Sequence, residues 1–220
     1  MVIVLGFLFA LSIICDLHGY YIKTSKYPLK QAQVIALGNW VVYVARILNV
    51  VFATTLGFLF ELQLSIRLSE VFFIGFLLAF MVSIFYLASP LVERGLNFLL
   101  GIIIYRPFPE LQGIQFWRKV SFGIGSRVLS MFVSANFIYL ALILPFLMAK
   151  LFPEFRMTAV FIGQFMNFIA TAILLSYVEP KIMYSFDTNE PNIFLDGFIF
   201  GRVILVGLMA TLSSLWFLLI

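Results

Sequence analysis

Residues 33–58 read QVIALGNWVVYVARILNVVFATTLGF, an apolar run that a single charged residue, Arg46, interrupts. A helix of this length crosses about 30 Å of hydrocarbon, and the run lacks the strict alternation of a barrel strand. Backbone groups cannot stay unpaired in lipid, so a membrane span this apolar is helical. A cation near the middle of such a span costs about 2.5–3.5 kcal/mol on insertion scales, which makes Arg46 the first candidate for function.

The remainder of the chain has the same character. Of its 220 residues, 63% are hydrophobic and 11% are charged, whereas soluble domains carry about 25% charged residues. This composition excludes a soluble domain and predicts an all-α polytopic membrane bundle, with residues 1–220 as a single integral membrane domain. We expect six transmembrane helices, over residues 1–22, 33–58, 71–92, 128–151, 157–178 and 198–219.

Several classes of site are disfavoured by the residues that the chain lacks. Cys15 and His18 are its only cysteine and histidine, so neither a disulfide framework nor a Cys/His metal site is expected. Nucleotide-binding loops and zinc-protease motifs are missing, and we expect no cofactor and no enzymatic activity. Carboxylates at Glu179 and between Asp187 and Asp196 leave an acid/base membrane enzyme as a minor alternative.

Basic residues predict the orientation in the membrane. They lie at the ends of apolar runs rather than in one stripe, which indicates lipid contact and not nucleic-acid binding. The regions after the first, third and fifth expected spans hold ten of them, and the opposite side holds three, Arg67, Lys150 and Arg156. The positive-inside rule then places both termini outside the cytoplasm. The ten are Lys23, Lys26, Lys30, Arg94, Arg106, Arg118, Lys119, Arg127, Lys181 and Arg202.

Two further segments are too short or too mixed to cross the bilayer. Residues 96–105 are apolar but only ten long, and we expect a short re-entrant or interfacial segment there. Residues 111–127 combine aromatic and basic residues, as in a helix that lies in the headgroup layer or in a plain connector. Small residues at 75, 79 and 83, at 126, 130 and 134, and at 197 and 201 predict helix-packing faces. Pro145 is expected to bend the fourth span.

Polar residues inside the spans form the candidate site. Asn39, Arg46 and Asn49 fall within one quadrant of the second span. Asp16, in the first span, lies about 7 Å from the level of Arg46, within reach of an arginine side chain. Two interpretations stay open: a structural ion pair that fixes helix register, or a substrate-binding Arg46 with Asp16 as exchangeable counter-ion. Further members of the polar set are Asn136, Gln164 and Asn167.

Scattered stretches of the chain resemble the Amj family of bacterial lipid II flippases. They are residues 153–159 (PEFRMTA), Gly163, Asn167, 178–180 (VEP), Ala45 and Arg46 with Asn49, 201–202 (GR) and 210–212 (ATL). The resemblance implies translocation of the undecaprenyl-pyrophosphate-linked peptidoglycan precursor across the bacterial cytoplasmic membrane. Its partners would then be this polyprenyl-pyrophosphate lipid and the membrane lipids.

The polar residues are compatible with such a substrate, because a diphosphate lipid needs a polar and partly cationic path. The midplane set would contact the diphosphate in a groove between the first, second and fifth spans, and a basic set would gather headgroups at the cytoplasmic surface. This second set is Lys23, Lys26, Lys30, Arg118 and Lys119. A small-solute or ion-coupled transporter and a non-transporting scaffold of envelope assembly remain alternatives.

Overall fold

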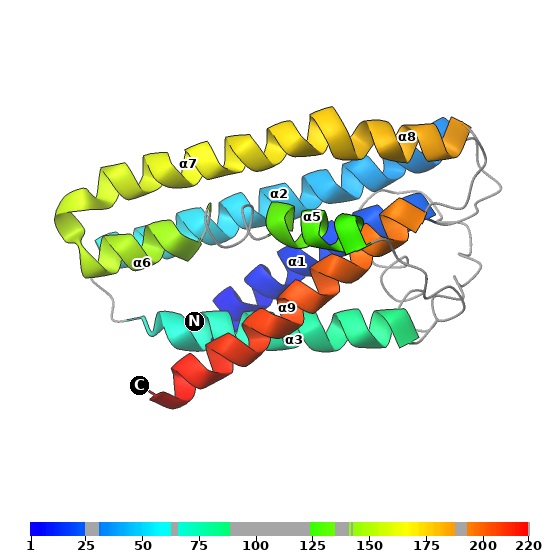
Figure 1. The fold of residues 1–220 in the computed structure, drawn as a ribbon. Coiled ribbons are helices and arrows are strands. Elements are labelled where there is room, and N and C mark those ends of the chain that lie inside the picture. Colours follow the sequence, from blue (N-terminus) through cyan, green and yellow to red (C-terminus); the bar gives the residue numbers. More distant parts are fainter. Residues whose placement is uncertain are drawn as a thin grey trace. The chain divides into compact units, whose positions relative to one another are not determined.

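The computed structural model describes residues 1–24, 31–62, 66–88, 124–134, 141, 143–187 and 193–219. These residues form helices and short connections, and no strand occurs among them (Figure 1). The α-helices are α1 (Val2–Thr24), α2 (Gln31–Glu61), α3 (Leu68–Ala88), α5 (Ile124–Ser134), α6 (Leu144–Leu151), α7 (Arg156–Ile173), α8 (Glu179–Asp187) and α9 (Ile193–Leu219). A 3-10 turn, η3 (Pro153–Phe155), precedes α7, and a π-helical segment, η4 (Leu174–Val178), joins α7 to α8.

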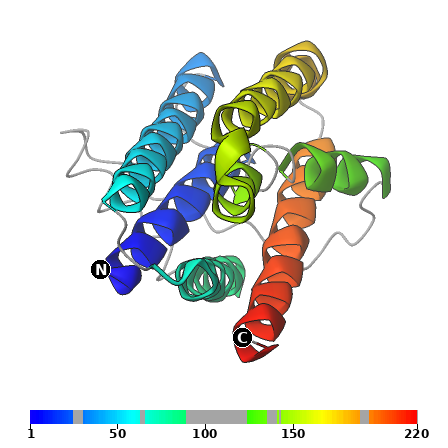
Figure 2. The same ribbon diagram turned by 90° about the vertical axis from the view of Figure 1, so that its left-hand side faces the viewer.

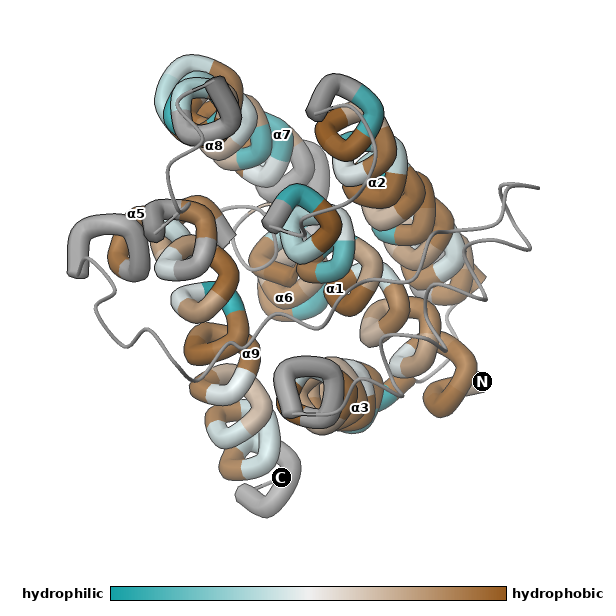
Figure 3. Tube along the Cα trace, turned by 90° about the vertical axis from the view of Figure 1, so that its right-hand side faces the viewer, coloured by the Kyte–Doolittle hydropathy of each residue, from teal (hydrophilic) through white to brown (hydrophobic). Residues whose placement is uncertain are grey.

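Among the described residues, four helical stretches are long and apolar enough to cross a membrane: Val2–Lys23, Gln33–Leu59, Phe161–Tyr184 and Gly197–Trp216. A shorter apolar stretch, Leu68–Ile84, covers most of α3. The hydropathy colouring shows α2 and α3 as mainly hydrophobic along their length, with isolated polar positions (Figure 3). The prediction of a helical membrane bundle is confirmed in this coarser form.

The chain divides into two compact units, one formed by Met1–Val120 with Val206–Ile220 and the other by Ser121–Leu205. In the first unit α1 lies between α2 and α3 and contacts both (Figure 2). Its Phe9 ring lies 5.1 Å from that of Phe52 in α2 and 5.0 Å from that of Phe76 in α3, measured between centroids. Phe72 completes this aromatic cluster, 5.6 Å from Phe9. The four rings are buried and join three helices.

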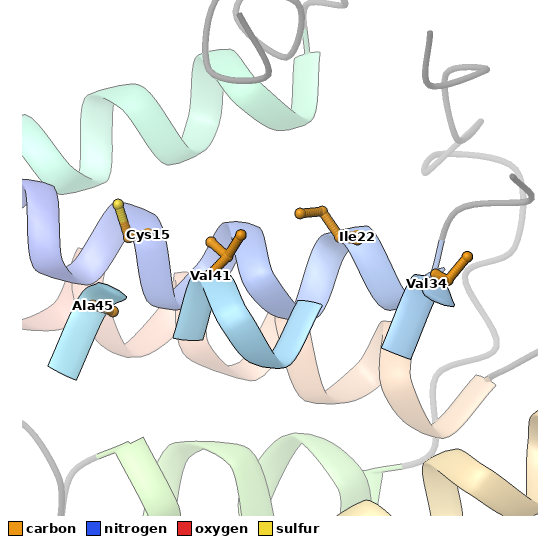
Figure 4. Packing of buried hydrophobic residues seen from close by; sticks show 5 residues of the cluster. All are labelled: Cys15, Ile22, Val34, Val41 and Ala45. Atoms are coloured by element: carbon orange, nitrogen blue, oxygen red, sulfur yellow. The ribbon is translucent and has the colours of Figure 1, made fainter. Parts of the chain in front are cut away.

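A second apolar cluster follows the interface between α1 and α2. It contains Cys15 and Ile22 of α1 with Val34, Val41 and Ala45 of α2 (Figure 4). The α2 members recur at intervals of seven and four residues, which is the spacing of one helix face. This periodicity settles which side of α2 turns inward.

Glycines let α1 approach both of its neighbours closely. A Cβ atom built on Gly19 would lie 2.7 Å from the carbonyl oxygen of Gly38, and one built on Gly38 would lie 2.6 Å from that of Gly19. On α3, a Cβ atom on Gly75 would come within 2.5 Å of the Phe9 ring. In lipid, where apolar helices gain little from hiding apolar surface, such close backbone contact is a main source of helix association.

The expected packing faces are buried wherever the structure describes them. Gly75, Ala79 and Ser83 are all buried on α3, and Gly197 and Gly201 are buried near the start of α9. Ser130 is buried on α5, and its hydroxyl donates a hydrogen bond to the carbonyl oxygen of Phe198 in α9. The side chains of the other two expected serines, at 126 and 134, lie outside the description.

The structure describes only part of the expected fourth span. Residues 128–151 contain the end of α5 and all of α6, and residues 135–140 between them lie outside the described part. Pro145 is the second residue of α6, and the described residues 141 and 143 before it are π-helical. The bend expected at Pro145 stays a prediction. There α6 packs against α7, where a Cβ atom on Gly163 would lie 2.7 Å from the Pro145 ring.

The fifth span is longer than the sequence predicts. Residues 157–178 were expected, but the helix continues through η4 and α8 to Asp187. The backbone amide of Glu179 bonds to the carbonyl of Leu174, five residues back, and Pro180 follows directly. The wider π turn accommodates a residue that cannot donate an amide hydrogen. The expected short segment at 96–105 lies outside the described residues. Residues 111–123 of the expected interfacial helix also lie outside them.

Candidate functional site

Arg46 lies at the midpoint of a candidate membrane span, since it is the central residue of the 27-residue stretch Gln33–Leu59. Its side chain is on the exposed face of α2. Asn39, two turns earlier, is also exposed, and Asn49 is half-buried. The structure therefore keeps the three predicted polar residues of α2 on one side of the helix, at and near the expected midplane.

Large apolar side chains surround this polar stripe. Trp40, Tyr43, Ile47 and Val50 are all exposed on the same side of α2. The opposite side of α2 carries the residues that pack against α1, including Val41, Ala45 and Phe52. The sequence turns Arg46 outward because the neighbouring Ala45 belongs to the packed face, and consecutive residues are about 100° apart around a helix.

Asp16 is half-buried on α1, and both it and Arg46 take part in interactions within the structure. Gly19 and Gly38 mark a common level of the two antiparallel helices. Asp16 lies three residues before Gly19, and Arg46 lies eight residues after Gly38. Because the helices are antiparallel, both lie in the same direction from the shared level, and their own levels differ by five residues, or about 7.5 Å. This separation agrees with the value derived from the sequence. The Asp16 to Arg46 ion pair itself stays a prediction.

The α1 to α2 interface is closely packed at several levels. The Gly19 and Gly38 backbones touch near one end, and Phe9 meets Phe52 farther along the helices. Val41 and Ala45 fill the interface between these two points. Arg46 is therefore accessible from the outer side of α2 and not along the line of contact between α1 and α2.

Lys23, expected to gather headgroups at the surface, is 1% exposed. A Cβ atom on Gly38 would lie 2.7 Å from the Lys23 Cγ, so the lysine stem crosses the space that this glycine leaves. The Lys23 Nζ is 4.8 Å from the centroid of the Tyr20 ring. In this conformation Lys23 belongs to the packing of α1 on α2, and its charge also suits the last turn of α1.

The remaining predicted residues divide into exposed and undescribed ones. Gln164 and Asn167 are exposed on α7, and the backbone oxygen of Asn167 accepts a hydrogen bond from Thr171 at 2.8 Å. They belong to the second unit, whereas Arg46 and Asp16 belong to the first. Their convergence with the α2 stripe stays a prediction. Asn136, Lys26, Lys30, Arg118 and Lys119 lie outside the described residues.

Arg202, which falls within the sixth expected span and was counted among the cytoplasmic basic residues, lies inside α9. It is 3% exposed, and its guanidinium carbon lies 4.9 Å from the centroid of the Phe198 ring. The midpoint of the span Gly197–Trp216 lies 4.5 residues away, or about 7 Å along the helix. The small residues Gly197 and Gly201 gave the signal for a buried helix start here, and Arg202 directly follows the second of them.

The site offers a cation and amides on a lipid-length helix, which suits binding of an anionic or hydroxyl-rich group. Within the described ranges, no three His, Cys, Asp or Glu side chains gather closely enough to hold a metal ion. Comparison with protein-family models, with curated proteins and with solved structures gives no significant match.

Proposed function

We propose that the protein is a lipid II flippase of the bacterial cytoplasmic membrane, which moves the undecaprenyl-pyrophosphate-linked peptidoglycan precursor to the outer leaflet. The proposal combines the Amj-like stretches of the sequence with the position of Arg46. One observation carries it: a guanidinium at the midpoint of a membrane-length helix, on the exposed side of that helix. A charge there is costly in lipid, so it is expected to have a functional or pairing role.

The outer face of α2 suits a substrate with a charged head and a long hydrocarbon tail. Trp40, Tyr43 and Ile47 offer apolar contact to a polyprenyl chain that stays in the bilayer. Arg46 and Asn39 offer hydrogen-bond donors to the diphosphate and the sugars at the level where water is scarcest. The guanidinium matches phosphate oxygens in a two-pronged geometry, which a lysine ammonium does not reproduce.

Membrane voltage supplies a driving force for this direction of transport. In a cell whose interior is negative, each negative charge that moves outward gains about 2.3 kcal/mol per 100 mV. Basic residues on the cytoplasmic side would attract the anionic headgroup to the surface, with about 1 kcal/mol of binding free energy for each residue. These residues are Lys26, Lys30, Arg118 and Lys119. No nucleotide is then required.

The expected topology has six spans, with both termini outside the cytoplasm. The described part of the chain contains four helices of spanning length and the shorter apolar helix α3, which support a topology with several spans. Within the first unit, the beginning of α1 and the end of α9 lie on the same side (Figures 1 and 2). An even number of crossings brings the two ends of a chain to one side of a membrane. The bias of basic residues then assigns that side to the exterior.

Replacement of Arg46 by Gln or Ala tests the proposal in a strain depleted of its own flippases. We expect the wild-type protein to restore growth. Both variants should fail to restore growth although they are present in the membrane at the same level as the wild type. Arg46→Lys keeps the charge but not the planar fork, and we expect partial rescue.

Arg67→Ala is the matched control for removal of an arginine. The Arg67 side chain is 79% exposed and forms a 3.0 Å ion pair with Glu70, a surface interaction worth about 0–1 kcal/mol. This variant is expected to grow like the wild type. Normal growth with Arg46→Ala would exclude Arg46 as the substrate contact, and loss of that variant from the membrane would favour the structural ion pair.

A further inference from the structure

Three exposed residues share one face at the junction of η4 and α8. Tyr177, Lys181 and Tyr184 are spaced by four and three residues, which places them one above the other on a helix. Tyr177 is 46% exposed and Tyr184 65%, and Lys181 is exposed between them. We call these three residues the Tyr-Lys face.

The outer part of this face, Lys181 and Tyr184, lies near one end of a candidate membrane span. The candidate span Phe161–Tyr184 has its midpoint between residues 172 and 173. Lys181 is 8.5 residues beyond that point, or about 13 Å along the helix, and half of the hydrocarbon is about 15 Å thick. Lysine and tyrosine at this depth typically direct their polar ends to the headgroup layer.

The lysine is held in place by its aromatic neighbour. Its Nζ donates a hydrogen bond of 2.6 Å to the Tyr177 hydroxyl and lies 4.3 Å from the centroid of the Tyr177 ring. Both contacts bring the ammonium against the tyrosine, one turn earlier on the same face. The face therefore presents a positive charge positioned against Tyr177, with the Tyr184 phenol farther along the helix toward the headgroup layer.

We propose that the Tyr-Lys face binds the phosphate of an anionic phospholipid of the surrounding bilayer. The charge is complementary, and the Tyr184 phenol can donate a hydrogen bond to a phosphate oxygen while the two tyrosine rings lie against the acyl chains. The nearby carboxylate, Glu179, is half-buried and about 200° away from Lys181 around the helix, so it does not share this face. Phospholipid binding here does not depend on the proposed flippase activity.

Native mass spectrometry of the intact protein tests this site. The protein is reconstituted in vesicles of equal parts phosphatidylglycerol and phosphatidylcholine, extracted gently and analysed for retained lipid. We expect the wild type to retain phosphatidylglycerol preferentially. Lys181→Gln should reduce that preference by about fivefold, the effect of one basic residue at a membrane surface. Tyr177→Phe, which keeps the ring and removes the hydroxyl, should reduce it less.

Lys150→Gln is the control, because Lys150 is an exposed lysine in the last turn of α6. It should leave the preference for phosphatidylglycerol unchanged. Equal retention of both phospholipids by the wild type would overturn the proposal, as would a Lys181→Gln protein that keeps the wild-type preference. Growth of the flippase-depleted strain, measured with the same variants, reports on transport independently of lipid retention.

Discussion

Arg46 combines a deep position with an outward direction. A guanidinium turned toward the packed α1 interface would have to compete with the apolar cluster around Val41 and Ala45. On the outer side it lies on the same face of α2 as the exposed Tyr43, Ile47 and Val50. The same residue in a sealed interior would have favoured a purely structural role.

Gly38 carries the tightest approach between α1 and α2, and Gly38→Ala should destabilise the protein. The added methyl group would lie 2.6 Å from the carbonyl oxygen of Gly19 and 2.7 Å from the Cγ of Lys23. Overpacking of this kind costs about 1–3 kcal/mol, which exceeds the roughly 1 kcal/mol that alanine gains in helix propensity. Thermal unfolding in detergent, followed by fluorescence-detected size exclusion, measures the change.

Gly57→Ala is the matched control on the same helix. A Cβ atom on Gly57 meets no other atom within 4 Å, so only the gain in helix propensity remains. This variant should unfold at or slightly above the wild-type temperature. The close-contact explanation fails if Gly38→Ala proves as stable as Gly57→Ala.

The sequence predicts charged residues in the spans but not the surroundings of each one. Lys23 ends an apolar run and therefore resembles a surface anchor, yet it is buried because Gly38 on another helix leaves space for its stem. No periodicity within α1 reveals that space. Arg202 falls four residues inside the expected span 198–219 and was counted with the cytoplasmic basic residues, whereas α9 begins nine residues before it, at Ile193.

At the scale of whole helices, the aromatic cluster is the feature that holds α1, α2 and α3 together. Phe9→Ala would remove the ring that touches Phe52, Phe72 and Phe76. We expect a loss of about 2–3 kcal/mol in the free energy of unfolding. This is less than the 3–5 kcal/mol typical of water-soluble cores, because lipid also solvates a separated phenylalanine. Unfolding by a denaturing detergent, monitored by circular dichroism, provides the measurement.

Phe7→Ala removes the same side chain from an exposed position of α1, two residues away. It should leave the unfolding free energy within about 0.5 kcal/mol of the wild type. Equal effects of the two substitutions would argue against the cluster as the link between the three helices.

The lengths of the apolar runs predicted where helices occur more accurately than where those helices begin and end. The runs at 1–22, 33–58 and 198–219 correspond to α1, α2 and α9, each of which extends by a few residues. The run at 157–178 stopped too early because Glu179, Pro180 and Lys181 have the composition of a helix end. The π-helical turn before Pro180 is what allows continuation, and that turn has no simple sequence signal.

At the scale of the molecule, the central claim is movement of a diphosphate lipid along the Arg46 side of α2. In the first unit α1, α2 and α3 pack closely together. The end of α9 contacts α3 where Gly207 approaches Phe80. The contacts of this unit favour a fixed arrangement of α1, α2 and α3 rather than a groove that opens between α1 and α2. Composition predicted the membrane class of this molecule, whereas the direction of Arg46 required the packing of α2 on α1.

The most direct measurement is transfer of labelled lipid II between leaflets of vesicles that contain this protein as their only transport protein. We expect the label to become accessible on the opposite side with the wild type and with Arg67→Ala, and to stay where it was placed with Arg46→Gln. Transfer no faster than in protein-free vesicles, or equal transfer by Arg46→Gln and wild type, would contradict movement of the lipid past Arg46.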